Sequence, residues 1–244
     1  MENPLASSVG RQQIEDLVGR TLLLVWFLTA TLRQASNFIL QISQAGTRQT
    51  WLLDTVHCFL LLGFSFLAAV LTIVRKPAKA VAGGLEPRIS AIVGTALMLS
   101  LPLLTPEEVS VEMKVLSATI VTVGLTLSVY CLFWLGRSWS IMAAARTLVT
   151  SGPYGVVRHP LYASELLSMF GIALYYISVP GLLIVLATIA FTLRRTYNEE
   201  RVLRSAFPEY EEYARRVPRI IPKIRFSKVG ESAPLTATEA TRRP

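Results

Sequence analysis

Long apolar runs constrain this chain more than any other feature of its sequence. The clearest extends from Trp51 to Val74, and another from about Met113 to Leu135. A helix needs about 20 apolar residues to cross the hydrocarbon core of a bilayer, and inside it the backbone must satisfy its own hydrogen bonds. Charged residues make up only 16% of the chain, against about 25% in soluble domains. We therefore expect an all-α, polytopic membrane protein.

Six apolar segments are long enough to be considered as transmembrane helices. The last two are short and are joined by a turn at Ser178-Val179-Pro180-Gly181, so we expect an antiparallel hairpin. The final helix should continue past the bilayer to about Phe207, because nothing interrupts it before Pro208. A short amphipathic helix, Glu209 to Arg216, should follow. The predicted spans are about 17–32, 51–74, 89–104, 113–135, 160–176 and 180–193.

The basic residues predict how the chain is oriented in the membrane. They gather in two loops and after Leu193, whereas the loop before the fourth span is acidic. Cytoplasmic loops carry an excess of Lys and Arg, so both termini should be cytoplasmic, in a plasma (inner) membrane protein. Arg33 and Arg48 are the exceptions to this arrangement. The basic loop residues are Arg75, Lys76, Lys79 and Arg88, then Arg137, Arg146 and Arg158, and the acidic ones are Glu107, Glu108 and Glu112.

The net charge of +8 does not require a nucleic acid partner. Basic residues beside apolar runs are typical of loops that face anionic lipid, so we expect membrane lipids as partners and no nucleic acid. Cys58 and Cys131 both fall inside predicted spans. Neither a disulfide framework nor a metal site is therefore indicated.

One long polar stretch, from Arg146 to Tyr162, interrupts the apolar pattern. Gly152-Pro153 predicts a turn, and Pro160 is well placed to open a helix because a first-turn proline loses no hydrogen bond. His159 and Tyr162 then lie three residues apart on one face of that helix. A helix start carries free N–H groups and partial positive charge, which suit a polar ligand group. The stretch is typical of a cofactor mouth at the membrane surface.

Four ordered motifs in the C-terminal half resemble the isoprenylcysteine carboxyl methyltransferase family and the related phospholipid methyltransferases. These are integral-membrane enzymes that use S-adenosyl-L-methionine. The resemblance covers roughly residues 132–222, and Gly155 departs from it, because many relatives carry a bulky residue there. The motifs are Leu148-Val-Thr-Ser-Gly-Pro-Tyr154, Arg158-His-Pro-Leu-Tyr162, Asn198-Glu-Glu-Arg201 and Tyr210-Glu-Glu-Tyr-Ala-Arg-Arg-Val-Pro218.

The apolar runs and the composition divide the chain into four parts, and the resemblance implies a cofactor site in the third. Residues 1–16 would be a cytoplasmic N-terminus, 17–135 a four-span region, 136–226 the catalytic region and 227–244 a disordered tail. Glu199, on the cytoplasmic extension of the sixth helix, would bind the cofactor too. The other residues expected around S-adenosyl-L-methionine are Arg146, Thr147, Leu148, Val149, Tyr154, His159, Pro160, Leu161 and Tyr162.

Simpler structural roles stay open for several of these residues. His159 could only cap neighbouring backbone, and Arg195 with Glu199 could be an ordinary i,i+4 ion pair. By the family pattern Arg195 is instead the cation on the acceptor side, and Glu200 faces elsewhere in a structural role. Glu165 lies about five residues into the fifth span. An acid there is costly unless it is paired or functional, so it is either a catalytic candidate or the partner of an arginine such as Arg158.

The expected activity is methyl transfer to a lipophilic, isoprenylcysteine-like acceptor that enters from the bilayer. A carboxylate acceptor needs no general base, whereas a protonated amine needs one, and Glu165 is the obvious candidate for it. With Arg195 available to hold a carboxylate, we favour O-methylation. The alternatives are a phospholipid N-methyltransferase, a thiol S-methyltransferase, a sterol-type reductase, or a non-catalytic membrane protein that retains the fold.

Overall fold

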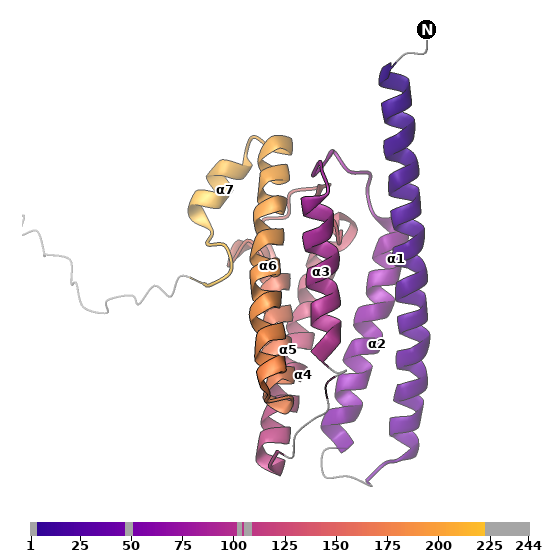
Figure 1. Cartoon of the computed structure of the whole chain (residues 1–244), viewed down its shortest axis with the longest axis vertical. Helices are drawn as coiled ribbons and strands as arrows, with labels where there is room; N and C mark the ends of the chain where they lie inside the picture. The colour runs from indigo at the N-terminus through magenta and orange to yellow at the C-terminus, as the bar shows by residue number, and fades with distance from the viewer. Residues whose placement is uncertain (1–3, 47–50, 102–103, 105–108, 223–244) are drawn as a thin grey trace, which may run out of the picture.

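The chain folds into a bundle of long helices with a cap of loops and one short helix at one end (Figure 1). The computed structural model describes residues 4–46, 51–101, 104 and 109–222, with side chains from Leu17 onward except 98 and 99. The helices are α1 (Pro4–Ser43), α2 (Trp51–Val74), α3 (Glu86–Ser100), α4 (Val111–Leu135), α5 (Pro160–Tyr175), α6 (Val179–Ala206) and α7 (Tyr210–Arg216).

Most helix bounds follow the apolar runs, as an all-α membrane protein requires. Helix α2 has the predicted bounds, and α6 ends at Ala206, just before the predicted stop at Pro208. Ser110 and Ser178 cap the starts of α4 and α6 with side-chain oxygens that accept backbone N–H groups. The first helix extends beyond its apolar run: it begins at Pro4 and continues through Arg33.

Among the described residues, four helical segments are long and apolar enough to cross a membrane. They are Leu17–Ser43, Trp51–Val74, Val111–Ser138 and Val179–Ala206. Helices α3 and α5 have 15 and 16 residues. At 1.5 Å per residue they are about 23 Å long, less than the roughly 30 Å hydrocarbon core. The predicted count of six spans therefore stays a prediction for these two helices.

The helices pack in two groups. Helix α1 packs on α2, α2 on α4 and α4 on α5, whereas α6 packs mainly on α3. The expected α5–α6 hairpin is present as a connection, but each of its helices finds its main partner elsewhere in the chain. Helices α4 and α5 approach closely because small residues line their seam: a Cβ on Gly124 would lie 2.3 Å from Ser168 Oγ. Small residues are the usual means of close packing in membranes.

A small two-stranded sheet closes one end of the bundle, and the sequence did not predict it. Strand β1 (Ala80–Val81) pairs antiparallel with β2 (Ala144–Ala145). Flanking backbone bonds extend this pairing, from Lys79 N to Ala145 O at 2.7 Å and from Ala82 N to Ala143 O at 2.9 Å. The loop after α2 therefore holds the loop after α4 in place.

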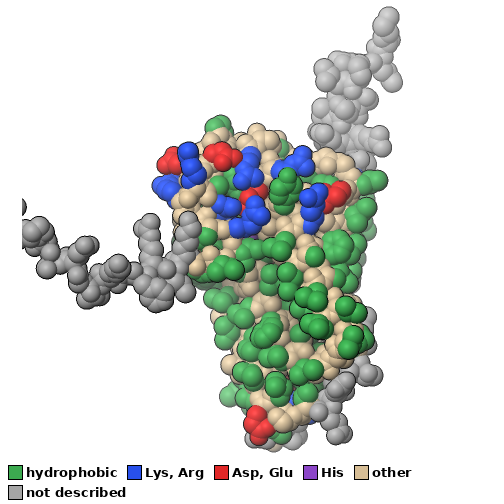
Figure 2. All heavy atoms as spheres, turned by 60° about the vertical axis from the view of Figure 1, so that its left-hand side comes forward, with side chains coloured by type: hydrophobic (Ala, Val, Ile, Leu, Met, Phe, Trp, Pro, Cys, Tyr) green, Lys and Arg blue, Asp and Glu red, His purple; other side chains and the backbone are tan. Residues whose placement is uncertain are grey.

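Two buried apolar clusters stabilise the fold. One joins α1, α2 and α4 around Leu132 and Trp139, and the other joins β2 to the end of α6 and to α7 around Phe207 and Tyr210. Charged side chains gather at the capped end, above a surface rich in hydrophobic side chains (Figure 2). Leu182 and Leu183 of α6 and Phe170 of α5 are exposed, as expected for contact with lipid. The predicted acidic residues Glu107 and Glu108 and the tail 227–244 lie outside the described residues.

Candidate functional site

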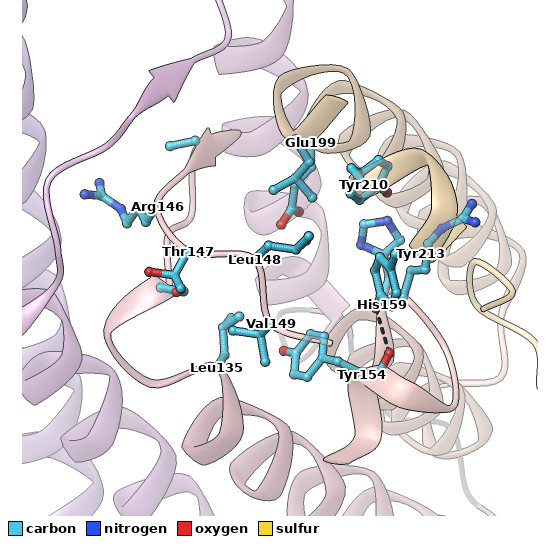
Figure 3. A pocket seen from close by; sticks show the side chains of 14 residues that line it. Leu135, Arg146, Thr147, Leu148, Val149, Tyr154, His159, Glu199, Tyr210 and Tyr213 are labelled. Atoms are coloured by element: carbon cyan, nitrogen blue, oxygen red, sulfur yellow. Dashed lines mark hydrogen bonds between the residues drawn. The ribbon is translucent and has the colours of Figure 1, made fainter. Parts of the chain in front are cut away.

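A pocket opens at the capped end, between the 144–159 loop, the C-terminal part of α6, and α7 (Figure 3). It brings together side chains from segments that are far apart in the sequence. Seven of the predicted cofactor residues line it: Arg146, Thr147, Leu148, Val149, Tyr154 and His159 from the loop, and Glu199 from α6. The remaining lining residues are Leu135, Ser138, Ala144, Arg158, Leu203, Tyr210 and Tyr213.

The turn at Gly152 gives the pocket loop its shape. Gly152 has a φ of 58°, and a Cβ at this position would lie 2.5 Å from the ring of Trp134. The short 3-10 helix η3 (Gly152–Gly155) follows and buries Tyr154, whose carbonyl accepts a 2.6 Å hydrogen bond from Tyr213 Oη. Burial raises the pKa of Tyr154 far above its usual value, so its hydroxyl stays protonated.

Arg146 lines the pocket, but its guanidinium points away from the centre (Figure 3). It donates a hydrogen bond to the carbonyl of Lys76, in the loop after α2. This contact ties the pocket loop to the N-terminal half of the chain. Thr147, Leu148 and Val149 follow it along the rim of the pocket.

His159 does not cap the backbone of α5, which was its simplest alternative role. Its ring is 4% exposed, and Nε2 lies 3.2 Å from Glu200 Oε1. The ring centroid is 5.7 Å from that of Tyr162, which confirms that the two share a face at the helix start. The ring of His159 thus faces the pocket on one side and contacts the buried carboxylate of Glu200 on the other.

Glu200 is the centre of a network of charged side chains next to the pocket. It is fully buried, and Arg158 and Arg219 each donate to it, with Nε to Oε1 distances of 3.0 Å. Arg204 adds a longer contact of 3.4 Å. The role predicted for Glu200, structural and facing away from Glu199, agrees with this network. Arg158 therefore pairs with Glu200 and not with Glu165, the pairing that the sequence had left open.

The chain after α7 is attached to the same network. The backbone N–H of Arg158 donates to Pro218 O at 2.8 Å, and that of His159 donates to Arg219 O at 2.9 Å. With the Arg219 side chain on Glu200, these bonds fix the segment beyond α7 against the start of α5. Both side-chain and backbone contacts thereby hold the start of α5 in place.

A second, smaller cavity, which has no space for a water molecule in this conformation, lies beside the pocket between α3, α5 and α6. Arg195 and Tyr162 line it, and Glu199 lines both cavities. Tyr162 Oη donates to Glu199 Oε2 at 3.1 Å, and the Arg195 guanidinium lies 5.0 Å from the centroid of the Tyr162 ring. The other lining residues are Pro87, Ala91, Ile141, Ala143 and Asn198.

Arg195 and Glu199 have separate partners, unlike an ordinary i,i+4 pair. Arg195 Nη2 donates to the carbonyl of Ile141 at 3.2 Å, whereas Glu199 takes the Tyr162 hydroxyl. Glu165 is partly buried on α5 and interacts electrostatically with both Arg195 and Glu199. Of the two predicted catalytic residues, Arg195 therefore lines the second cavity, whereas Glu165 lines neither cavity and lies within electrostatic range of Arg195 and Glu199. Pro160 and Leu161 line neither cavity; Pro160 opens α5, and Leu161 packs in the first apolar cluster.

Sequence reasoning missed several residues that line the two cavities, and Tyr210 and Asn198 are two of them. Tyr210 lines the pocket from α7, and Asn198 lines the second cavity, where its Nδ2 donates to Glu86 Oε1 at 3.1 Å and to Ser90 Oγ at 3.3 Å. Both belong to motifs that carry the resemblance, which was the available signal. The contact to α3 had no such signal, because Glu86 is more than a hundred residues away in the chain.

Comparison with known proteins covers the C-terminal half of this architecture. Residues 113–210 match the family model for phospholipid methyltransferases. The cobalt-zinc-cadmium resistance protein CzcN of Cupriavidus metallidurans is 40% identical over 106 residues, which are 40% of this chain and 47% of CzcN. The nickel-cobalt-cadmium resistance protein NccN of Alcaligenes xylosoxydans xylosoxydans is 33% identical over 116 residues, 45% of this chain and 53% of NccN. The chain spans about half the length of these curated relatives.

Proposed function

We propose that this membrane protein transfers a methyl group from S-adenosyl-L-methionine to the carboxylate of a lipophilic, isoprenylcysteine-like acceptor, because residues 113–210 match the family model for phospholipid methyltransferases. One observation carries the proposal. Glu199 lines both the pocket and the second cavity, so the two spaces adjoin at a single side chain. A methyl donor in one and an acceptor in the other would meet there, and such positioning is the main contribution a protein makes to an in-line displacement.

The pocket residues fit the cofactor in their chemistry. One end is apolar, with Leu135, Leu148 and Val149, and the other is polar, with Glu199 and Tyr210. The apolar end suits the adenine ring, and Glu199 suits the cationic amino group. When bound, the cofactor supplies an electrophilic methyl group on a sulfonium. The residues of this chain orient it, and aromatic rings such as Tyr154 favour a nearby cation.

The residues of the second cavity suit a carboxylate acceptor, and the proposal requires the cavity to open to admit one. Arg195 lines it with a guanidinium that keeps its charge in a dry site and can hold two carboxylate oxygens. The contact with Ile141 and the stacking on Tyr162 fix the direction of that guanidinium. A carboxylate held there is already a nucleophile and needs no proton removed. The acceptor's apolar part would remain between the helices, in contact with lipid.

An N-methyltransferase is the second candidate, and Glu165 is the observation that favours it. Its charge lies close to those of Arg195 and Glu199, beside the second cavity. A carboxylate in this position could remove a proton from an ammonium acceptor such as a phospholipid head group. The domain family includes enzymes of that type by its name.

The deciding experiment supplies methyl-labelled S-adenosyl-L-methionine to membranes that contain the chain and treats the products with alkali. We expect volatile labelled methanol, because alkali cleaves a methyl ester. Label that stays on the lipid fraction would contradict O-methylation and support the N-methyl or S-methyl alternatives. Membranes with Glu199→Gln are the control. A chain that neither binds the cofactor nor transfers label would be a non-catalytic relative.

A further inference from the structure

One buried tyrosine hydroxyl in the cofactor pocket has no hydrogen-bond partner in the part of the chain that the structure describes. Tyr210 is fully buried, and its Oη forms no hydrogen bond with the residues that the structure describes. The ring is well fixed, with the Tyr213 ring 5.9 Å away and the Arg204 guanidinium 5.5 Å from its centroid. A buried polar group without a partner costs free energy, so a native protein rarely keeps one without a reason.

The neighbouring tyrosine on α7 shows what a structural hydroxyl looks like in this site. Tyr213 is also buried, but its Oη donates to the Tyr154 carbonyl at 2.6 Å and so holds the pocket loop. Both tyrosines line the pocket, one turn apart on the same helix. Of these two hydroxyls, that of Tyr210 has no partner among the described residues and is available for a ligand.

The charges around Tyr210 indicate which ligand group it would meet. Glu199, its neighbour across the pocket (Figure 3), can only accept hydrogen bonds and therefore suits the cofactor's ammonium group. Arg158 and His159 also lie at this end, but both are engaged by Glu200. Burial raises the pKa of Tyr210, so its hydroxyl stays protonated and able to donate. It is the donor at this end that is not already taken.

We propose that Tyr210 Oη donates a hydrogen bond to the α-carboxylate of S-adenosyl-L-methionine, beside the ammonium group on Glu199. The amino-acid end of the cofactor would thus be bound as a zwitterion by one acceptor from α6 and one donor from α7. This inference rests on the proposed function, because it assumes the same cofactor in the same pocket. It adds α7 to the binding site as a specificity element for the carboxylate.

The test compares two ligands on two proteins. S-adenosyl-L-methionine and its decarboxylated form differ only in the carboxylate, so equilibrium binding of both to the parent and to Tyr210→Phe isolates that contact. We expect Tyr210→Phe to weaken binding of the full cofactor roughly ten- to a hundredfold, the value of a hydrogen bond to a charged group. Binding of the decarboxylated form should stay within about twofold. Tyr197→Phe, the same change on an exposed tyrosine, should alter neither affinity.

Thermal unfolding without ligand separates binding from a structural role. Tyr210→Phe breaks no hydrogen bond within the described part of the chain, so its Tm should be at least that of the parent. Tyr213→Phe removes the bond to Tyr154, and its Tm should fall by about 2–4 °C. Equal losses for both ligands, no loss for either, or a Tm that falls as far as that of Tyr213→Phe would each overturn the inference. A parent that binds neither ligand would overturn the proposed function as well.

Discussion

At the scale of single residues, two consecutive glutamates on α6 have opposite surroundings. Glu199 faces the two cavities and contacts one hydroxyl group, whereas Glu200 is fully buried among Arg158, Arg219 and His159. Successive residues on a helix point about 100° apart, so adjacent acids can serve a ligand and a structural network at once. The two substitutions should therefore have different consequences.

Glu200→Gln should destabilise the fold. The neutral amide cannot balance the arginines that converge on this buried position, and breaking a buried ion pair costs about 3–5 kcal/mol. We expect the free energy of unfolding in detergent to fall by that amount. Glu212→Gln is the matched control: its pair with Arg216 is exposed, so its effect should stay within about 0.5 kcal/mol. Equal effects of the two changes would contradict the network as described.

Arg195→Lys and Glu199→Gln should separate the role of Arg195 in orienting the acceptor from the role of Glu199 in binding the cofactor. Lysine keeps the charge but loses the planar fork, so Arg195→Lys should leave cofactor affinity within about twofold and slow methyl transfer at least tenfold. Glu199→Gln should weaken cofactor binding directly, because an amide oxygen is a poorer partner for an ammonium group. Equilibrium binding and transfer rate are measured for each variant. If both lose cofactor to the same extent, the two residues act as one structural pair.

The motifs predicted which residues lie at the site, but they did not predict where each side chain points. Seven of the predicted cofactor residues, including Glu199, line one pocket, as the resemblance implied. The guanidinium of Arg146 nevertheless turns to the Lys76 carbonyl, seventy positions away. Spacing along a chain shows which side chains share a helix face. It does not show which distant segment will pack against them.

At the scale of elements, the η3 turn depends on one glycine. Gly152 combines a positive φ with contact to the Trp134 ring, so a side chain there is both strained and crowded. Gly152→Ala should lower the free energy of unfolding by about 1–3 kcal/mol and weaken cofactor binding by shifting Tyr154. Gly63→Ala, in α2 with no heavy atom within 4 Å of the new Cβ, should be neutral or stabilise by up to about 1 kcal/mol.

Binding and unfolding measurements on both glycine variants check this prediction. If Gly152→Ala binds the cofactor as the parent does, the turn does not shape the pocket.

Helices such as α2 and α6 could be predicted because long apolar runs determine them. Strands β1 and β2 could not, because a strand of two residues has no periodicity to detect.

At the scale of the whole molecule, the β1–β2 pairing places the loop after α2 and the loop after α4 at the same end of the bundle. Helix α7 and the start of α1 lie at this end too (Figure 1). The basic loops predict that it is cytoplasmic. We expect Ala78→Cys and Ser151→Cys to react with an impermeant thiol reagent only from the cytoplasmic side.

Val109→Cys should react only from the opposite side, because it precedes α4 at the other end of the bundle. Labelling of intact cells, compared with labelling of inverted membranes, makes the measurement. Reaction of Ala78→Cys from outside would contradict the orientation. Reaction of Ala78→Cys and Ser151→Cys from different sides would contradict the sheet itself.

The packing of α3 on α6 has a consequence for how this protein could be divided. The family match begins at residue 113, yet Pro87 and Ala91 of α3 help to line the second cavity, and Glu86 and Ser90 hold Asn198. We therefore expect two complementary fragments of the chain to bind to each other. A polypeptide that ends after α3 and another that starts before α4, synthesised separately in one cell, should reassociate into a cofactor-binding pair. The second fragment alone should be degraded or inactive, although it contains every residue that the family model matches.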